Sequence, residues 1–328
     1  MTNANGLKHL SDLDLIYSYL VNAGKLGDLE PANALRCALK CAHDAGVMIR
    51  NNVEGRALGS EVNLNTKSSV ADLVTETDVA VEKCIRARIS QTFPSHMFVG
   101  EETANGEISQ SARSAGFVWI IDPIDGTTNF VHAFPIVTVS IALAYKDESV
   151  MGVVYNPLTD EAWFAWKGCG AYMKRACGSI VSIRTSTCTS VGSALISTGF
   201  GVAFLRRQTK AVSEQAKILE IVSQNVKVLM TGARDIRRIG SAACDMCYVA
   251  MGRTDSYFEF GVREWDIAAG LVILHEAGGE SSTIRGATPY SIRGRNVLVA
   301  ATNALRVELN SVLREDNIIE LIEIVESN

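Results

Sequence analysis

Residues 119–129 read WIIDPIDGTTN, and this stretch carries three large apolar residues directly into two aspartates. The apolar run is typical of a buried strand, in which an unpaired charge is costly. Asp122 and Asp125 are separated only by a proline and an isoleucine. A turn explains Asp125-Gly126, but it does not explain a carboxylate directly at the end of the strand. We therefore expect the two aspartates to serve a functional site.

Three other acidic segments stand at similar boundaries of the chain. Glu101 and Glu102 follow a short apolar run, Asp78 lies at the start of a predicted helix, and Asp266 opens another. Taken singly, the two aspartates can be helix N-caps, and the glutamate pair can be a solvated loop. Taken together with Asp122 and Asp125, the carboxylates suit Mg²⁺, which prefers oxygen ligands.

A phosphate site is indicated by Gly126-Thr127-Thr128, directly after the aspartates. If a helix begins there, its free amides attract an anion. The Thr127 hydroxyl can orient a water, and the carbonyl oxygen of Ile124 can add a metal ligand. A pair of bound metals would neutralise a phosphate and lower the pKa of a bound water. An acidic protein can bind phosphate in this way.

Composition narrows the class of protein. The chain has 328 residues and a net charge of -5, so it lacks the basic surface of a general nucleic-acid binder. It contains no apolar run of the roughly 20 residues that span a bilayer, and its first residues do not resemble a targeting segment. Its eight cysteines are scattered, as reduced core residues are. We expect a cytoplasmic protein with no membrane partner.

Periodicity predicts a mixture of helices and strands. The second predicted helix has Val79, Val81, Ile85 and Ile89 as core candidates, and 54–67 is predicted as a loop. Helices are predicted over 34–50, 77–91, 207–223, 241–251 and 266–277. Strands are predicted over 97–100, 117–122, 137–145, 150–155, 162–166, 171–174, 256–260 and 296–301. The fold class is α+β, with layers of helices on mixed sheets.

These residues resemble the inositol monophosphatase family. The first motif is WIIDPIDGTTNF (119–130) and the second is WDIAAG (265–270), both without an obvious break. Supporting segments are KSSVADLVTETD (67–78), FVGEE (98–102), GSAA (240–243) and YFEFGVREWD (257–266). The similarity covers about residues 34 to 310.

The resemblance implies two to three Mg²⁺ ions. Glu101, Asp122, Thr127 and the Ile124 carbonyl would hold the first ion. Asp122, Asp125 and Asp266 would hold the second, and a weaker third ion would lie near Glu101. Glu101 and Thr127 would then position the attacking water, with Asp78 orienting the threonine hydroxyl.

The resemblance also implies the substrate contacts. The amides of Gly126 and Thr127 would bind phosphate, and Lys67 would lie in a mobile loop that closes over the metals. The hydroxyls of a sugar alcohol would be contacted by Asp125, Gly240, Ser241, Ala242 and Glu259.

The implied fold is a layered αβαβα sandwich, assembled as a homodimer and often inhibited by lithium. Residues 1–32 would be an extension of uncertain order, with a short helix around Asp14 to Val21. Residues 33–328 would form one catalytic domain of two closely packed halves, about 33–180 and 181–328.

The predicted function is hydrolysis of a small polyol phosphate, with myo-inositol 1-phosphate as the first candidate. Related phosphatases that act on 3'-phosphoadenosine 5'-phosphate, fructose 1,6-bisphosphate or histidinol phosphate are the alternatives. A non-catalytic binding protein of the same fold is the alternative from another class.

Two further features receive structural interpretations. Cys244 and Cys247 have C-x-x-C spacing without a second pair, which favours core packing over zinc binding. Asp235, Arg237 and Arg238 are predicted to form a solvated charged face rather than an approach for an anionic substrate.

Overall fold

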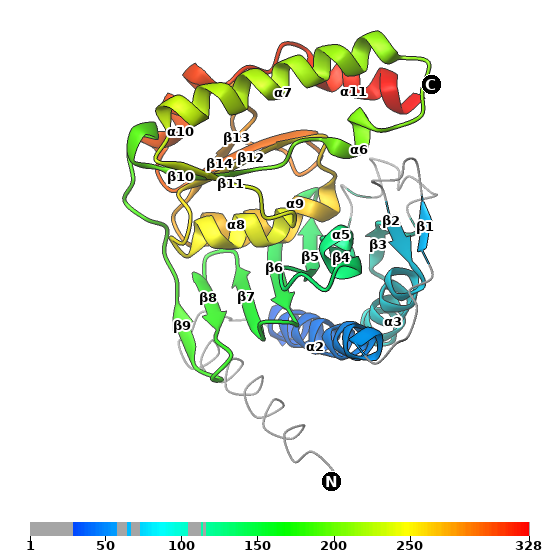
Figure 1. Cartoon of the computed structure of the whole chain (residues 1–328). Helices are drawn as coiled ribbons and strands as arrows, with labels where there is room; N and C mark the ends of the chain where they lie inside the picture. Colours follow the sequence, from blue (N-terminus) through cyan, green and yellow to red (C-terminus); the bar gives the residue numbers. More distant parts are fainter. Residues whose placement is uncertain (1–28, 58–63, 67–72, 104–112, 114–115, 328) are drawn as a thin grey trace.

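The chain folds into five layers, in which helices and sheets alternate (Figure 1). The computed structural model describes residues 29–57, 64–66, 73–103, 113 and 116–327. Helices α2 and α3 form the first layer, a large sheet the second, α8 and α9 the third, a smaller sheet the fourth, and α7, α10 and α11 the fifth. The predicted αβαβα sandwich of the α+β class is therefore confirmed.

The large sheet has seven strands in the order β3-β4-β5-β6-β7-β8-β9. Only the β3–β4 pair is parallel. β5 is buried along nearly its whole length because helices cover both faces of the sheet, which explains its apolar sequence. The strands are β3 (Met97–Gly100), β4 (Phe117–Asp125), β5 (Thr138–Tyr145), β6 (Glu148–Asn156), β7 (Glu161–Trp166), β8 (Ala171–Lys174) and β9 (Ile180–Ser182).

The smaller sheet has the strand order β11-β10-β12-β14-β13 and is also mixed. β10 pairs in parallel with β11 and β12, whereas β14 pairs antiparallel with β12 and β13. A separate pair, β1 (Leu64–Thr66) and β2 (Leu73–Thr75), is antiparallel. The five strands are β10 (Leu195–Thr198), β11 (Asp235–Arg237), β12 (Ser256–Phe260), β13 (Glu280–Ser282) and β14 (Asn296–Ala300).

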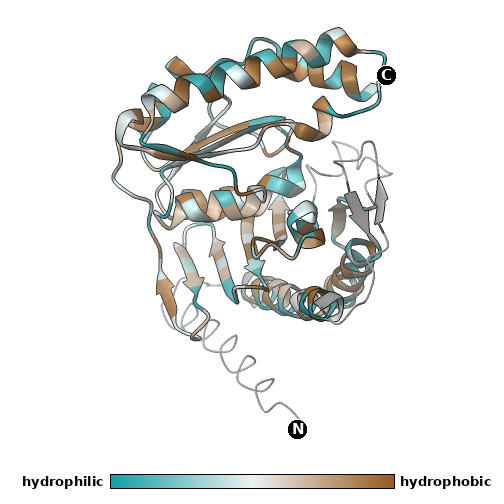
Figure 2. Cartoon of the chain, in the orientation of Figure 1, coloured by the Kyte–Doolittle hydropathy of each residue, from teal (hydrophilic) through white to brown (hydrophobic). Residues whose placement is uncertain are grey.

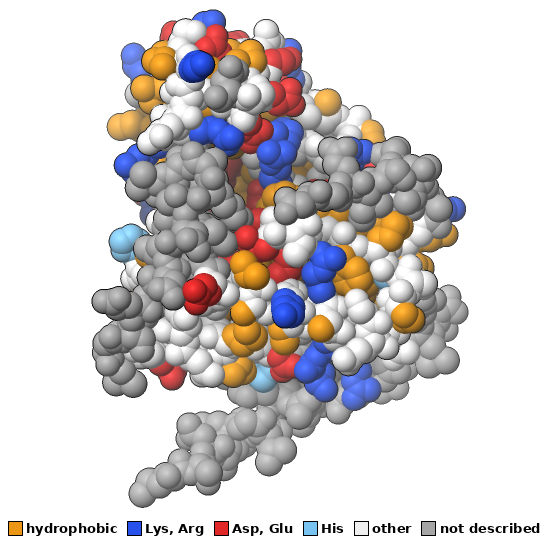
Figure 3. Space-filling model, turned by 90° about the vertical axis from the view of Figure 1, so that its right-hand side faces the viewer, with side chains coloured by type: hydrophobic (Ala, Val, Ile, Leu, Met, Phe, Trp, Pro, Cys, Tyr) orange, Lys and Arg blue, Asp and Glu red, His pale blue; other side chains and the backbone are white. Residues whose placement is uncertain are grey.

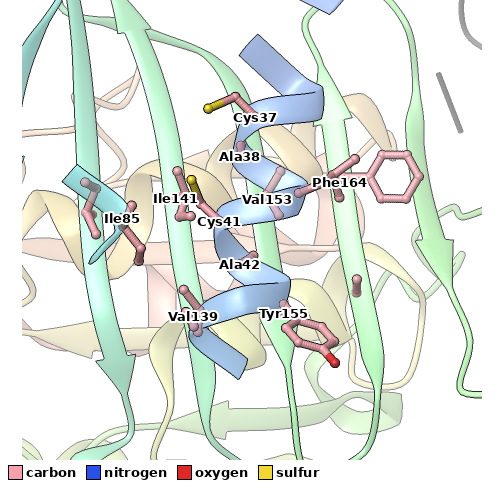
Figure 4. Packing of buried hydrophobic residues seen from close by; sticks show 14 of the residues in the cluster. Cys37, Ala38, Cys41, Ala42, Ile85, Val139, Ile141, Val153, Tyr155 and Phe164 are labelled. Atoms are coloured by element: carbon pink, nitrogen blue, oxygen red, sulfur yellow. The ribbon is translucent and has the colours of Figure 1, made fainter. Parts of the chain in front are cut away.

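Helix α2 (Leu29–Ala57) packs its small side chains against the large sheet (Figure 4). Cys37, Ala38, Cys41 and Ala42 of this helix are buried, and they face apolar residues of the strands. Small residues let the helix approach the sheet closely. The helix extends beyond the predicted 34–50, so the loop predicted for 54–67 was wrong at its first residues and at β1.

Helix α3 (Glu76–Thr92) lies beside α2 and matches its predicted span. Val81, Ile85 and Ile89 are buried as predicted, but Val79 is 52% exposed. The prediction for Val79 was wrong because position 79 lies off the face that carries positions 81, 85 and 89.

The middle layer consists of α8 (Ala242–Ala250) and α9 (Glu264–Glu276). Seven of the nine residues of α8 and eight of the thirteen residues of α9 are buried, since both helices lie between the two sheets. In the hydropathy colouring this layer is mainly brown and white, with teal at its right-hand end (Figure 2). Both helices start near the residues predicted from the sequence. The first residues of each helix lie near the carboxylate cluster described below.

The outer layer contains α7 (Val212–Gly232), α10 (Asn303–Val312) and α11 (Ile318–Ser327). A helix was predicted over 207–223, which is wrong at both ends. Helix α7 ends later than predicted because it continues through Asn225. The Asn225 side chain is buried and donates to the carbonyl oxygen of Arg314 at 2.8 Å, so this residue does not end the helix. The short helices α5 (Thr127–Val131), α6 (Val202–Leu205) and η2 (Val191–Ser193) complete the fold.

None of the helices in the described ranges is long and apolar enough to cross a membrane. The helix predicted around Asp14 to Val21 and the loop residue Lys67 lie outside the described residues.

Candidate active site

A β-bulge places the two central aspartates. β4 pairs with β5 so that Asp122 faces Ser140 and Asp125 faces Thr138, with the register shifting between them. Side chains of a regular strand alternate, so residues three apart would point to opposite faces. The bulge removes this restriction and turns both carboxylates toward one site. The strand thus continues through Pro123 to Asp125, where the sequence predicted a turn after Asp122.

Asp125 is held by four hydrogen-bond donors. The Ser241 hydroxyl donates to Oδ2 at 2.7 Å, as does the amide of Ala243, also at 2.7 Å. The Ala242 amide donates to Oδ1 at 3.2 Å, and the Thr138 hydroxyl to Oδ2 at 3.3 Å. Burial raises the pKa of Asp125, while these donors oppose the rise. The start of α8 therefore fixes Asp125 in one orientation.

Asp122 is buried and Asp266 is partly exposed, and both lie among other carboxylates. Burial raises the pKa of Asp122 well above its ordinary value, and the charges of Glu101, Asp125 and Asp266 raise it further. Burial and the neighbouring Asp125 do the same for Asp266. Asp266 is not the N-cap of α9: it is the third helical residue and accepts the Arg263 amide at 2.6 Å. The structure thus brings the four predicted carboxylates into one electrostatic cluster.

Thr127 begins α5 directly after Gly126, whose φ of 95° favours glycine. Its hydroxyl donates to the carbonyl oxygen of Ile124 at 3.2 Å and to Asp78 Oδ1 at 3.5 Å. Asp78 is the third residue of α3 rather than its N-cap, and it is 1% exposed. Two residues predicted to cooperate are therefore within hydrogen-bond distance.

Glu101 lies in a turn that α3 holds in place. The Glu101 amide donates to the carbonyl of Ile121 at 3.2 Å. The buried carboxylate of Glu82 accepts the Glu102 amide at 2.8 Å and also accepts the Thr103 hydroxyl. Glu82 was not identified from the sequence, although its position one helical turn after Asp78 is a usable signal.

A cavity of about 230 Å³ opens beside Asp125 and Asp266. Figure 3 shows acidic side chains gathered in a hollow of the molecular surface. Gly240, Ala242 and Glu259 line the cavity. Ser241 is 1% exposed, and its hydroxyl binds Asp125. The Ser241 side chain therefore supports the site by holding Asp125 in place.

Glu259 is fixed by its surroundings. Tyr257 donates its hydroxyl to Glu259 Oε2 at 2.6 Å. Gly199 lies so close that a methyl group in its place would overlap the Glu259 carboxylate. The absence of a side chain at position 199 therefore makes room for Glu259 at the cavity wall.

Two charged residues of the cavity wall, Arg238 and Asp245, were not assigned to the site from the sequence. Asp235, Arg237 and Arg238 are exposed, as predicted for a solvated face, and Asp235 pairs with Arg237 at 2.6 Å. Arg238 also lines the cavity. Asp245 also lines the cavity and is 2% exposed. Its position one turn into α8, after the Gly-Ser-Ala segment, was the available signal.

The donor set suits a hard cation. No group of three His, Cys, Asp or Glu side chains in the described ranges is already arranged to hold a metal. The buried carboxylates nevertheless raise one another's pKa values, and ionising them together requires positive charge. Carboxylate, carbonyl and hydroxyl oxygens are the ligands that Mg²⁺ prefers.

The C-x-x-C pair is structural. Cys244 and Cys247 are fully buried in the core between the sheets, and burial raises the pKa of both thiols. All eight cysteines are free thiols. The predicted core packing is therefore confirmed for this pair.

Comparison with known proteins gives matches over nearly the whole described chain. A family model described as the inositol monophosphatase family matches residues 30–317. Inositol monophosphatase 1 of Sus scrofa is 38% identical over 269 residues, covering 82% of this chain and 89% of that protein. Nus factor SuhB of Haemophilus influenzae is 34% identical over 278 residues, covering 85% and 95%.

Solved structures share the fold. Extragenic suppressor protein suhB from Bartonella henselae superposes with a TM-score of 0.71 at 28% identity, covering 87% of this chain and 99% of that one. The structure of SaIMPase-II with bound inositol monophosphate, from an enzyme of Staphylococcus aureus, has a TM-score of 0.67 at 28% identity, covering 89% and 99%.

Proposed function

Because this chain belongs to the inositol monophosphatase family and is a phosphomonoester hydrolase, we propose that it hydrolyses a small polyol phosphate, with myo-inositol 1-phosphate as its preferred substrate. One observation carries the proposal: the carboxylate cluster opens into a small polar cavity that Glu259 lines. One end of this site suits a phosphate, and the other suits the hydroxyls of the leaving alcohol.

The cofactor of this proposal is Mg²⁺, with two to three ions per site. Glu101, Asp122, Thr127 and the Ile124 carbonyl would hold one ion, and Asp122, Asp125 and Asp266 a second. A third would lie near Glu101. When bound, Mg²⁺ neutralises phosphate charge and makes water more acidic. The raised pKa values of Asp122 and Asp266 support this assignment, because a cation is what allows such a cluster to ionise.

The residues around Thr127 orient the nucleophile. The Thr127 hydroxyl lies between Asp78 and the Ile124 carbonyl, so both acceptors limit its rotation. With Glu101 it would hold a water in line with the phosphorus atom. The amides of Gly126 and Thr127 would bind the phosphate oxygens. Water is the nucleophile in this scheme, so no covalent phosphoenzyme forms.

The cavity would hold the alcohol. Glu259, Gly240 and Ala242 would contact its hydroxyls, together with Asp125, and Ser241 would hold Asp125 in place. A cavity of about 230 Å³ suits a ring the size of inositol. Lys67 would act from the loop outside the described residues. A homodimer, lithium inhibition and a cytoplasmic location stay predictions.

Phosphate release across a substrate panel tests the proposal. The panel contains myo-inositol 1-phosphate, 3'-phosphoadenosine 5'-phosphate, fructose 1,6-bisphosphate and histidinol phosphate, each with Mg²⁺ and with a chelator. We expect the highest kcat/KM for the inositol ester and no turnover with the chelator. A higher kcat/KM for another ester would show that this ester, and not inositol 1-phosphate, is the preferred substrate. Turnover in the presence of the chelator would show that the reaction does not need the metal.

Glu259→Gln separates binding of the alcohol from the chemistry. We expect this variant to raise KM for inositol 1-phosphate about tenfold, because the alcohol would then donate to a neutral amide oxygen instead of a carboxylate. An equal loss of activity on every phosphomonoester would show that Glu259 does not recognise the alcohol.

A further inference from the structure

Two walls of the substrate cavity meet at one aromatic ring. Helix α6 lines one wall with Val202, Ala203 and Phe204, and the segment between β12 and α9 lines the adjoining wall with Gly261 and Val262. Gly261 has a φ of 82°, and a side chain at this position would overlap the Phe204 ring. The shape of the cavity therefore depends on how these two short segments pack against each other.

Both segments are tied to Glu326, in the last turn of α11. Arg263, directly after the second wall, donates Nη2 to Glu326 Oε1 at 3.0 Å. Arg207, two residues after α6, donates Nη2 to the backbone carbonyl oxygen of Glu326 at 2.9 Å. Figure 1 shows the end of α11 close to α6. One residue of the outer layer thus contacts the segments that form both walls.

Arg295 strengthens this connection. Its Nη1 and Nη2 donate to the two carboxylate oxygens of Glu326 at 3.1 and 2.9 Å, which is the bidentate geometry of a strong ion pair. The Arg295 carbonyl also accepts the Gly261 amide at 2.6 Å, so the backbone joins Arg295 to the second wall. We call Glu326, Arg207, Arg263 and Arg295 the Glu326 cluster.

The charge of Glu326 is maintained by its partners. Burial raises the pKa of Glu326, but the three arginines outweigh burial and hold this pKa below its ordinary value. The carboxylate is therefore ionised at neutral pH, and its bonds to Arg263 and Arg295 are charge-assisted.

We propose that Glu326 is a positioning residue, which holds the two cavity walls through Arg207 and Arg263 at the spacing that the leaving alcohol needs. This inference rests on the proposed function, since the alcohol must occupy the cavity. The Arg263 amide also binds Asp266 at 2.6 Å, but this backbone contact does not involve the Glu326 carboxylate. The Glu326 cluster therefore affects binding of the alcohol more than binding of the phosphate.

Two variants of the full chain test the two ties separately. Glu326→Gln removes the charge that Arg263 and Arg295 bind, and we expect KM for inositol 1-phosphate to rise about tenfold, the effect of one hydrogen bond to a charged group. Arg207→Met removes the donor to the carbonyl, and we expect a rise of about fivefold. Inorganic phosphate occupies only the carboxylate end, so its inhibition constant should change by less than about twofold in both variants.

Hydrogen exchange measures the positions of the walls without a substrate. We expect the amides of 258–266 to exchange about tenfold faster in Glu326→Gln, and those of 199–207 in Arg207→Met, while the amides of β6 keep their rates. Glu323→Gln and Arg206→Met are the matched controls, because each changes an exposed neighbour of the same charge. Neither control should alter exchange or KM.

An unchanged KM, or an equal rise in KM and in the inhibition constant of phosphate, would overturn the proposal. Unchanged exchange in both segments would also overturn it, because the walls would then be held without Glu326. If the wild-type protein hydrolyses none of the esters, the proposed function fails, and exchange alone judges the inference. Faster exchange in both segments then supports it, and unchanged exchange overturns it.

Discussion

Replacing Ser241 by alanine tests whether the start of α8 holds a catalytic carboxylate in place. The Ser241 hydroxyl donates to Asp125 at 2.7 Å and accepts the Cys244 amide at 3.3 Å as the N-cap of α8. Ser241→Ala removes both bonds from a residue that is 1% exposed, so water does not replace them easily.

The cost follows from these two bonds. Loss of an N-cap costs about 1 kcal/mol, and loss of a hydrogen bond to a charged group costs about 1.5 to 3 kcal/mol. Three donors to Asp125 remain, so we use the lower value and expect the free energy of unfolding to fall by about 2.5 kcal/mol. Asp125 also becomes less firmly oriented, and we expect the Mg²⁺ concentration needed for half-maximal activity to rise about tenfold.

Thr302→Ala is the matched control. Thr302 is the N-cap of α10, accepts the Leu305 amide at 3.2 Å, and donates to the carbonyl of Cys188 at 2.7 Å. It also loses a cap and a donated bond, but the acceptor is neutral. We expect a loss of about 1.5 to 2 kcal/mol in stability and no change in the Mg²⁺ requirement.

Urea unfolding gives the free energies, and phosphate release titrated with Mg²⁺ gives the requirement. The acid limb of the pH–rate profile should also move to higher pH in Ser241→Ala, because one of the donors that lowers the pKa of Asp125 is lost. The reasoning is refuted if Ser241→Ala and Thr302→Ala have the same Mg²⁺ requirement and the same acid limb.

Three further predictions concern the cluster and the cavity. Asp122→Asn should nearly abolish turnover, and normal phosphate release would contradict the metal assignment. The same variant should raise the free energy of unfolding of the metal-free protein at neutral pH by about 1 kcal/mol or more, because a like charge is removed. The folded-state pKa values of Asp122 and Asp266 lie well above their ordinary 3.8, so the folded protein keeps protons that the unfolded chain releases. The free energy of unfolding, measured in chelator from pH 4 to pH 8, should therefore fall with rising pH more steeply in the wild type than in Asp122→Asn, and adding Mg²⁺ should restore it. A shallower fall in the wild type than in Asp122→Asn would contradict this prediction. Gly199→Ala should raise KM for inositol 1-phosphate about tenfold by displacing the Glu259 carboxylate, as measured by initial rates, and an unchanged KM would show that Glu259 is not held there.

The sequence predicted the layered fold and the members of the acidic cluster because those features are local. Asp122, Asp125 and Asp266 stand at the ends of apolar segments, and that pattern is visible without tertiary contacts. The bulge between Asp122 and Asp125 was interpreted as a turn, because a proline two residues before a strand's end suits both structures.

Residues that act through tertiary contacts were harder to predict. Asp245 lies in an apolar helix, and only the approach of α8 to β10 and β12 makes it part of a cavity wall. Arg238 follows two exposed charged residues, so its local sequence resembles a solvated face. Ser241 was assigned to the substrate, but the fold turns its hydroxyl to Asp125. The polarity of these residues was evident, but the direction in which they point depends on both halves of the chain.

The contacts of Asp125 also have a consequence for synthesis on the ribosome. Glu101, Asp122 and Asp125 leave the ribosome well before the start of α8 and before Asp266. Until that later segment arrives, Asp125 lacks the donors from Ser241, Ala242 and Ala243. The nascent large sheet must therefore tolerate a group of carboxylates on its own, and the site is completed only when the second half of the chain docks. A chain truncated before α8 should accordingly depend on chaperones.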